Sequence, residues 1–560
     1  MATATPAFVA AQTSPGDAAA QQLEQLQRRQ QEQIQRDLES TRRVAPPGGA
    51  DLRATPAPVQ PAAVPGACHD IREIVIHNSP RLRQAARAEI DSRFAGHCLG
   101  VNEITEILGL ITKDYIVQGY VTSRAYLPAQ DLKQGTLTID VVEGTIEHFR
   151  IDDEGKKSVP AGAVFPTHEG QVLNLRDLEQ GIDQINRLQS NNARLEILPG
   201  EAAGGSVVTV HNTPTRSVHL ITSYDNQGQE GTGVHQASAT VVLDNLAGLG
   251  EQVSVSHRES VPFPDGDHHT QSDGLDLWLP HGYDTWTASV IRSTYRNVLT
   301  LPSGTQQPAE GSNSIVTVGY DRVVHRDEVG RLSLGTALTT KDATNFFAGQ
   351  LLDVSSRKLT LLDVRGSYSR VVLGTGLLNA SLDVVQGLKT FGALRDPELL
   401  TSEQPHAQFS KLQAGAQLHL PFEGLGQRWS YDGEIAAQKA YDSLYGSEKM
   451  LIGSFYTVRG FYNSSLSGDN GFYWRNSLSL LRQFRAGNDT VAARAYAALD
   501  FGRVSNVGPE DGGNLSGAAV GLQLQWRALT WDVFYAAPIS KPASLAREPG
   551  QTWFRLSAAL

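Results

Sequence analysis

The feature that most constrains this chain is a long alternation of apolar and polar residues, which runs from residue 214 to residue 560 without a helical pattern. In the stretch DTWTASVI, Trp286, Ala288 and Val290 fall on one face of an extended strand, and threonine and serine fall on the other. Such two-faced strands suit a wall between lipid and water, and at roughly 20 to 22 residues per strand and turn the segment predicts a membrane β-barrel of about 16 antiparallel strands.

Composition agrees with a barrel and excludes other classes. A soluble β-sandwich also alternates, but this segment is too long for one sandwich, and its polar faces carry glutamine, arginine and aspartate strand after strand. The mean hydropathy of -0.27 and the lack of a run of about 18 apolar residues argue against a membrane-spanning helix. The net charge is -11, without a basic block, so nucleic acid is not an expected partner.

The segment before the barrel reads as two small α/β modules in tandem. The order in the first is strand, helix, helix, strand, strand, and a shorter copy follows. The expected elements of the first module are a strand at 70–77, helices at 80–94 and 102–119, and strands at 120–127 and 135–144. Those of the second are a strand at 145–151, a helix at 174–189, and strands at 193–200 and 205–212. We therefore expect domains at 68–144 and 145–212, followed by a barrel at 213–560.

Three segments precede these modules. Residues 1–15 contain the small-residue pattern VAA before Gln12, which resembles a signal-peptide cleavage site, so we read them as the remnant of a secretory signal or as disordered. Residues 16–43 are rich in Gln, Glu, Arg and Ala, which predicts a helix that is polar nearly all round. Such a helix suits water or a polar, water-filled tube rather than an apolar core. Residues 44–67 form a Pro/Ala/Gly linker able to reach tens of ångströms.

The chain has only two cysteines, Cys68 and Cys98. No CxxC or Cys/His spacing indicates zinc. In an exported protein a lone pair favours a disulfide, and closing this loop would contribute about 3 to 4 kcal/mol. Two unrelated buried thiols are the alternative reading.

One arginine stands out in the barrel segment. Arg459 lies in the aromatic stretch FYTVRGFYNSS, where Gly460 permits a sharp turn and the side chain can point into the barrel. In the later strand RAYAALDFG, Asp500 falls on the lumen face, just before the flexible Gly502. A bidentate pair between Arg459 and Asp500 would satisfy two charges that are otherwise poorly solvated. The alternative is that both are ordinary lumen residues facing water.

The whole arrangement resembles the TpsB transporters of two-partner secretion, which are related to the barrel-assembly protein BamA. The two modules resemble POTRA domains. The stretch Val458, Arg459, Gly460 and Phe461 matches the family's VRGF/Y motif, at the tip of a loop folded back into the barrel, here about 450–466. The resemblance implies that Arg459 pairs with the acid of the family's D-x-G strand motif. That motif is matched by Asp500, Phe501 and Gly502.

Two departures from the family pattern stand out. The chain has Leu560 as its last residue, where outer-membrane barrels usually finish on an aromatic. The cysteine pair occurs in only part of the family, and it favours the haemolysin or contact-dependent-inhibition branch over the haemagglutinin branch.

The sequence supports a catalytic or metal-binding function less well than a transporter. His268 and His269 follow Asp265 and Asp267, but a turn of Pro, Asp and Gly with charged neighbours is usually a solvated loop. No GxSxG, P-loop or HExxH occurs in the required context, so we expect no metal, no cofactor and no enzyme activity. An outer-membrane lipase is the enzyme alternative, and no motif singles out its serine.

The resemblance implies an outer-membrane transporter with its POTRA domains in the periplasm. It would accept an unfolded, large β-helical exoprotein through those domains and secrete it through the barrel without ATP. The barrel itself would contact outer-membrane lipid. Two alternatives stay open: a barrel-assembly factor, which usually carries more POTRA units and no plugging helix, and a passive porin or receptor, which has no use for two periplasmic modules.

Overall fold

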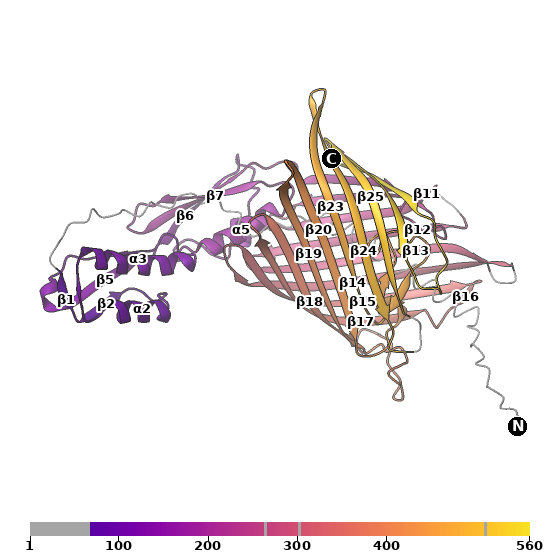
Figure 1. Ribbon diagram of the computed structural model, residues 1–560, viewed down its shortest axis with the longest axis horizontal. Coiled ribbons are helices and arrows are strands. Elements are labelled where there is room, and N and C mark those ends of the chain that lie inside the picture. Colours follow the sequence, from indigo (N-terminus) through magenta and orange to yellow (C-terminus); the bar gives the residue numbers. More distant parts are fainter. Residues whose placement is uncertain (1–67, 263–265, 301–303, 509–511) are drawn as a thin grey trace.

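The computed structural model describes residues 68–262, 266–300, 304–508 and 512–560. Two α/β units lie side by side at one end of the molecule, and a β-barrel forms the rest (Figure 1). We call the barrel end next to these units proximal and the opposite end distal. In the described residues no helix has the length and apolar character needed to cross a bilayer.

The barrel is closed. Within the described residues it holds sixteen strands of eight residues or more, each antiparallel to its neighbours, with a two-residue strand beside the seventh. The strands are β9 (Val218–Asp225), β10 (His235–Asp244), β11 (Gln252–Val261), β12 (His269–His281), β13 (Asp284–Thr300), β14 (Gln306–Arg326), β15 (Gly330–Phe347), β16 (Gln350–Leu351), β17 (Arg357–Val372), β18 (Gly376–Leu388), β19 (Ser410–Gly424), β20 (Gln427–Ala440), β23 (Asn470–Ala486), β24 (Asp489–Ser505), β25 (Gly513–Trp526), β26 (Leu529–Ser540) and β27 (Gln551–Ala559). The predicted barrel of about 16 strands is confirmed.

The last strand closes the barrel against the first. Residues 555–559 of β27 pair antiparallel with residues 221–225 of β9. Leu560 continues this ladder, because it exchanges two backbone hydrogen bonds with Leu220, of 2.8 and 3.1 Å. The chain therefore completes its seam through the backbone of a leucine in place of an aromatic residue.

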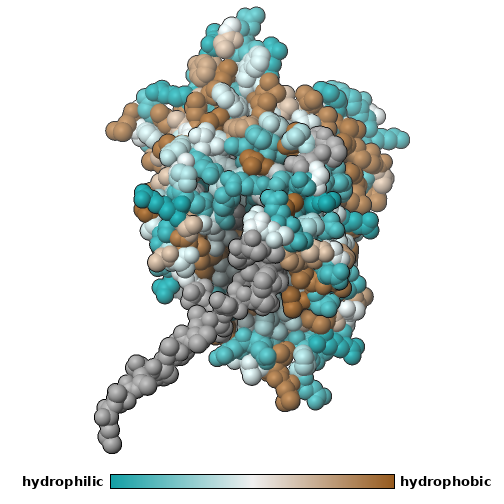
Figure 2. Space-filling model, turned by 90° about the vertical axis from the view of Figure 1, so that its right-hand side faces the viewer, coloured by the Kyte–Doolittle hydropathy of each residue, from teal (hydrophilic) through white to brown (hydrophobic). Residues whose placement is uncertain are grey.

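Side chains of the barrel strands alternate between the outer surface and the interior, as the sequence predicts. Trp286 is half exposed on the outer surface, as are Leu522 and Trp526, whereas Asp500 is buried on the inner side. Seen from the distal end, brown hydrophobic residues lie along the sides, and teal hydrophilic residues cover much of the end itself (Figure 2). An apolar outer surface around a polar interior is what a barrel in a bilayer requires.

The first α/β unit is a three-stranded sheet covered by two helices. Its elements are β1 (His69–Ile71), β2 (Glu73–His77), α2 (Gln84–Phe94), β3 (His97–Leu99), α3 (Val101–Val117), β4 (Arg124–Tyr126), the 3₁₀ turn η1 (Leu132–Gln134) and β5 (Thr136–Val142). The sheet order is β2-β5-β4, with β2 parallel to β5. Its core joins the apolar stripe of α3 to the sheet through Ile107, Ile111 and Tyr115, each about 1% exposed or less.

Two expectations for this unit were wrong, and one strand was not predicted. The single strand expected at 70–77 is two strands, β1 and β2, which belong to different sheets. The short strand β3 pairs with β1 and was missed, because three residues carry no periodicity. The strand expected at 120–127 is only β4, since residues 119–123 form turns in which Tyr120 N donates to Tyr115 O at 3.0 Å and Ser123 N to Tyr120 O at 3.2 Å.

The second α/β unit repeats the plan with one long helix. Its elements are β6 (Thr145–Asp152), α4 (Ala161–Val164), α5 (Leu175–Asn186), β7 (Ala193–Pro199) and β8 (Gly205–Asn212), with sheet order β6-β8-β7. Asn174 caps α5, because its side chain accepts a 2.9 Å hydrogen bond from Arg176 N. The sequence did not predict the four-residue helix α4. The expectations for residues 1–67, a signal remnant, a polar helix and a linker, lie outside the described residues.

Candidate functional site

The connection between β20 and β23 turns back into the barrel. It begins with the 3₁₀ turn η2 (Gly446–Glu448), and its two limbs pair as the short strands β21 (Met450–Ile452) and β22 (Leu466–Gly468). Val458 and Phe461 at its tip are at most 1% exposed, and they pack with residues of β23, β24 and β25. We call residues 441–469 the re-entrant loop.

Arg459 at the loop tip and Asp500 on β24 form a bidentate ion pair. Arg459 Nε lies 2.5 Å from Asp500 Oδ2, and Arg459 Nη2 lies 2.6 Å from Oδ1. The backbone N–H of Arg459 also donates to Oδ2, at 3.1 Å. Both residues are buried, at 6% and 3% exposed. Charge-assisted bonds in this fork geometry fix the orientation of both side chains.

The rest of the guanidinium is satisfied by β23. Nη1 and Nη2 of Arg459 each donate to Ser477 Oγ at 3.2 Å, and Nη2 also donates to Asn476 O at 3.2 Å. Sequence reasoning missed Ser477 and Asn476. The available signal was the alternation of β23, which places Ser477 on its lumen face beside the aspartate strand.

Three glycines let the loop tip lie directly on the barrel wall. A Cβ on Gly517 would lie 1.7 Å from Arg459 O, and one on Gly502 would lie 2.9 Å from a methyl carbon of Val458. Gly460 has φ +100°, and a Cβ there would meet the Ala537 carbonyl carbon at 2.5 Å. Gly502 was expected to provide flexibility. It lies within β24, and what requires glycine there is this close approach.

Aromatic side chains flank the tip. Phe455 contacts Trp553 and Phe534, with ring centroids 5.9 and 5.5 Å apart, and Tyr462 contacts Trp553 at 5.2 Å. Phe501, the middle residue of the D-x-G match, points the other way: it is 37% exposed on the outer surface, beside Phe472. The structure thus brings Arg459, Gly460 and Asp500 together and leaves Phe501 out of the site.

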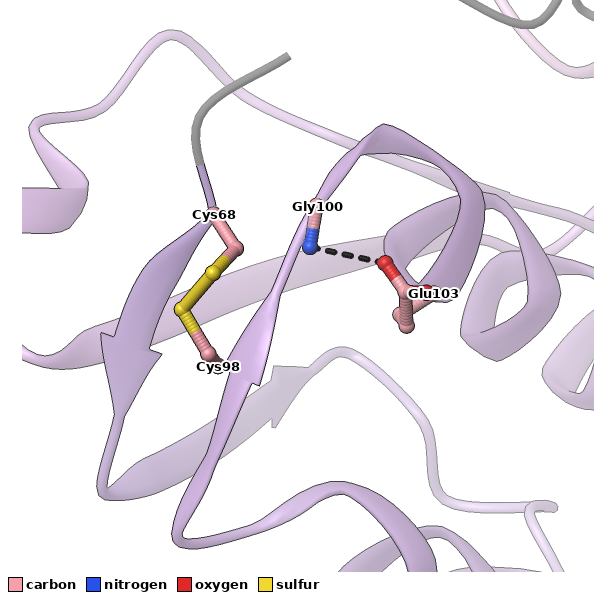
Figure 3. Close-up of a disulfide and its surroundings, with 4 residues drawn as sticks. All are labelled: Cys68, Cys98, Gly100 and Glu103. Carbon is pink, nitrogen blue, oxygen red and sulfur yellow. Dashed lines mark hydrogen bonds between the residues drawn. A yellow bond between two sulfur atoms is a disulfide. The ribbon is translucent and has the colours of Figure 1, made fainter. Parts of the chain in front are cut away.

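The cysteines lie in the first α/β unit, away from the loop. Cys68 and Cys98 form a disulfide with their Cα atoms 5.3 Å apart, which ties the chain just before β1 to β3 (Figure 3). Two residues later, Gly100 N donates to Glu103 Oε2 at 2.8 Å and begins α3. The bond therefore holds the start of the unit against the segment between its helices.

A second buried contact joins α5 to the proximal end of the barrel. Arg326 lies at the end of β14, and its side chain is 1% exposed. It donates to Asp183 Oδ2 at 2.7 Å and to Gln180 Oε1 at 3.1 Å. Burial raises the pKa of the Asp183 carboxyl, and the Arg326 guanidinium opposes this. The Arg187 guanidinium lies 3.6 Å from the centre of the Trp278 ring. Sequence analysis did not predict this junction, which depends on contacts between distant segments.

The sequence predicted no metal site and no cofactor. Among the described residues, no group of three His, Cys, Asp or Glu side chains could hold a metal ion. His268 Nδ1 lies 3.0 Å from the carbonyl oxygen of Gly231, as in an ordinary loop. Asp265 lies outside the described residues.

Comparisons with known proteins agree with this architecture. The family model "Haemolysin secretion/activation protein ShlB/FhaC/HecB" matches residues 204–524. A ShlB-type POTRA domain matches residues 69–144, and a POTRA domain matches residues 145–199. The family match covers more than half of the chain. The first POTRA match spans the first α/β unit, and the second covers the second unit as far as β7.

Named relatives and a solved structure give the same result. The outer membrane transporter CdiB of Dickeya dadantii (strain 3937) is 32% identical, over 86% of this chain and 85% of its own length. The hemolysin transporter protein ShlB of Serratia marcescens is 34% identical, over 73% of this chain and 71% of its own. The structure of CdiB from Escherichia coli superposes with a TM-score of 0.85 at 31% identity, covering 98% of this chain and 100% of that one.

These matches identify the membrane in which the barrel lies and its orientation in that membrane. The CdiB relative is named an outer membrane transporter, and the barrel lies in the bacterial outer membrane. The POTRA domains are at its proximal, periplasmic end, and the re-entrant loop enters from the distal, extracellular end. The chain belongs to the haemolysin secretion/activation family ShlB/FhaC/HecB and is a TpsB transporter that secretes exoproteins by two-partner secretion.

Proposed function

We propose that the client of this transporter is one large β-helical exoprotein that arrives unfolded and docks on the POTRA domains. The observation that carries this proposal is that both POTRA sheets have strand edges, β4 in the first and β7 in the second. An extended client can add to such an edge as a further strand, with backbone hydrogen bonds for affinity and side-chain pockets for specificity. Exposed apolar residues Val117 and Tyr126, 62% and 54% exposed, lie in the first domain.

The lumen wall is suited to passage of an extended chain. Charged side chains that point inward are paired with one another, for example Arg494 with Asp432 at 2.8 Å and Arg475 with Glu434 at 3.5 Å. Paired charges offer a polar surface with few isolated charges to hold a client. The sequence carries no nucleotide-binding motif, so we propose that folding of the client outside the cell drives its export.

We propose that the pair of Arg459 and Asp500 keeps the re-entrant loop in the position that transport requires. The bidentate geometry, the burial of both groups and the three glycines support this role. The loop is then a working part of the pore, held by a defined contact.

We propose that the chain is divided into two POTRA domains at 68–144 and 145–212 and a barrel at 213–560. Three segments, 1–15, 16–43 and 44–67, precede them. We propose that residues 16–43 form a polar helix that occupies the lumen at rest, because only a wet environment suits their composition. Deleting them should raise single-channel conductance in planar bilayers while the barrel stays folded. An unchanged conductance would place the segment elsewhere.

We further propose that the outer surface contacts outer-membrane lipid through half-exposed apolar residues such as Trp286, Leu382 and Val520. The chain is proposed to act without catalysis, without a cofactor and without nucleic acid, since no motif supports any of them.

Deleting the gene and comparing the culture supernatants by mass spectrometry tests the proposed client. We expect one large protein to disappear and to return when the wild-type gene is restored. General loss of outer-membrane proteins would instead support an assembly factor, and unchanged supernatants with altered solute uptake would support a passive porin. Pull-down of the missing protein's N-terminal segment by the full transporter in detergent would then test the POTRA docking.

A further inference from the structure

A second charged contact holds the re-entrant loop at the place where it enters the barrel. Glu448 ends the turn η2, and one residue separates it from the start of β21. Its side chain is 2% exposed, so the carboxylate is out of contact with bulk water. A carboxylate in such a place must be compensated by its neighbours.

Two lysines from separate strands compensate it. Lys341 Nζ on β15 lies 2.6 Å from Glu448 Oε1, and Lys411 Nζ on β19 lies 3.0 Å from Oε2. Lys411 also donates to the main-chain oxygen of Glu448, at 3.0 Å. The carboxylate therefore clamps the start of the loop between two parts of the barrel wall.

The clamp also fixes the other limb of the loop. Gln438 Nε2 on β20 donates to the main-chain oxygens of Glu448 and Asp469, each at 3.1 Å. Asp469 is fully buried and accepts a 2.8 Å bond from the backbone N–H of Leu444. Both limbs thus meet at one buried polar junction before they descend as β21 and β22.

The clamp and the tip hold different strands. Glu448 contacts β15, β19 and β20, whereas the tip around Arg459 contacts β23, β24, β25 and β26. The two sets share no strand. A loop attached at two separate sites can be released at one of them while the other holds.

We propose that Glu448 is a second, independent anchor of the re-entrant loop, a positioning residue that fixes the root of the loop to Lys341 and Lys411 whether or not Arg459 is bound to Asp500. When the tip leaves Asp500, the loop pivots about this root and stays attached to the wall formed by β15 and β19. The relevance of the pivot to secretion rests on the transport role proposed above for the loop.

Single cysteines measure the accessibility of the root and of the tip separately. Ser443 and Thr457 are each 4% exposed, the first at the root and the second near the tip. Because Cys68 and Cys98 are joined in a disulfide, a Ser443→Cys or Thr457→Cys substitution supplies the only free thiol. Labelling by a membrane-impermeant maleimide is followed on full-length protein in outer membranes, with heat-modifiable mobility used to count only folded barrels.

Glu448→Gln keeps the shape and removes the charge. We expect it to speed labelling of the root thiol by about tenfold or more while the tip thiol stays near the wild-type rate. Arg459→Ala is expected to do the reverse. Glu310→Gln, at an exposed position of β14, is the matched control and should change neither rate.

The proposal is overturned if the root thiol of Glu448→Gln is labelled at the wild-type rate. It is also overturned if Arg459→Ala speeds labelling of the root thiol as much as Glu448→Gln does, because the loop would then move as one unit. Should Glu448→Gln fail to give folded barrels, Lys341→Met, which removes one clamp partner from the wall, gives the same comparison. Secretion is measured alongside. If Glu448→Gln speeds labelling of the root thiol while secretion stays normal, the anchor proposal is supported and the proposed role of the loop in transport is contradicted. The two proposals can therefore fail separately.

Discussion

The carbonyl oxygen of Arg459 lies so close to Gly517 that a Cβ on this glycine would stand 1.7 Å from it. The two residues are 58 positions apart in sequence and belong to the loop tip and to β25. The contact shows that the loop tip lies directly against the backbone of the wall, at the same residue that pairs with Asp500.

Gly517→Ala should therefore displace the loop tip. An added methyl group meets a backbone oxygen, which cannot move aside without shifting the loop, so we expect near-normal barrel levels with strongly reduced secretion. Gly366→Ala on β17 is the control, since its nearest atom would be 3.8 Å away. Secretion assays and heat-modifiable mobility of both variants check this. Normal secretion by Gly517→Ala would mean that the loop does not need this position.

The disulfide should stabilise the first POTRA domain. Cys68 and Cys98 enclose a loop with a sequence separation of 30, so loss of the bond should lower the free energy of unfolding by about 3 to 4 kcal/mol. Cys98→Ser combined with Cys68→Ser should unfold the domain at lower urea concentration, with a smaller effect on secretion. Intrinsic fluorescence and limited proteolysis report the unfolding. Equal urea midpoints with and without the bond would contradict the expectation.

Arg326 should hold the second POTRA domain on the barrel. Arg326→Ala removes the nearer cation of the buried Asp183, which lies 2.7 Å away, and leaves Arg331 at 3.6 Å. Removing one partner of a buried pair costs about 3 to 5 kcal/mol. We expect the segment between β8 and β9, residues 213–217, to become sensitive to protease while both domains stay folded. Arg322→Ala, which removes an exposed arginine of the same strand, is the control. Equal protease sensitivity of the two variants would show that the contact does not hold the domain.

His211 gives the second POTRA domain a dependence on pH. Its ring lies 3.1 Å from Glu196 and 2.9 Å from Asp152, and hydrogen bonds to these two carboxylates raise its pKa. A raised folded-state pKa stabilises the protein fully below the unfolded value near 6.5, and this contribution is lost as pH rises through the folded-state pKa. Because the site is exposed, the effect is small.

Hydrogen exchange of the β8 peptide measures that effect. Wild type should be better protected than His211→Gln at pH 5.5, and the two should be nearly equal at pH 8.5. His168→Gln, which changes an exposed histidine of the same domain, is the control. A difference between wild type and His211→Gln that does not depend on pH would argue against titration of this group.

The sequence predicted the barrel because alternation is a local property that every strand repeats. The two segments on their own indicated an arginine in a loop and an acid on a lumen face, and the resemblance to the TpsB family implied that Arg459 pairs with Asp500. Ser477 and Gly517 could not be found this way. Their roles depend on which strand lies beside the loop tip, and that is set by the register of β23, β24 and β25.

Glu448 shows the same limit in another form. Its segment SLYGSEKM has no periodicity, and nothing local separates it from a solvated turn. Its importance comes from two lysines that lie 107 and 37 residues away. Short elements such as β3 and α4 escaped prediction for the related reason that three or four residues are fewer than a pattern needs.

The pairing of Arg459 with Asp500 predicts a non-additive pair of defects. Arg459→Ala leaves a buried carboxylate without its cation, and Asp500→Ala leaves a buried guanidinium, each at a cost of about 3 to 5 kcal/mol to the docked loop. The barrel should still assemble, because its closed ladder of backbone hydrogen bonds does not depend on either side chain. We therefore expect near-normal outer-membrane levels with strongly reduced secretion for both variants. The double alanine variant should be little worse than either single one, since the interaction is lost only once. A double defect equal to the sum of the single defects would show that the two residues act independently.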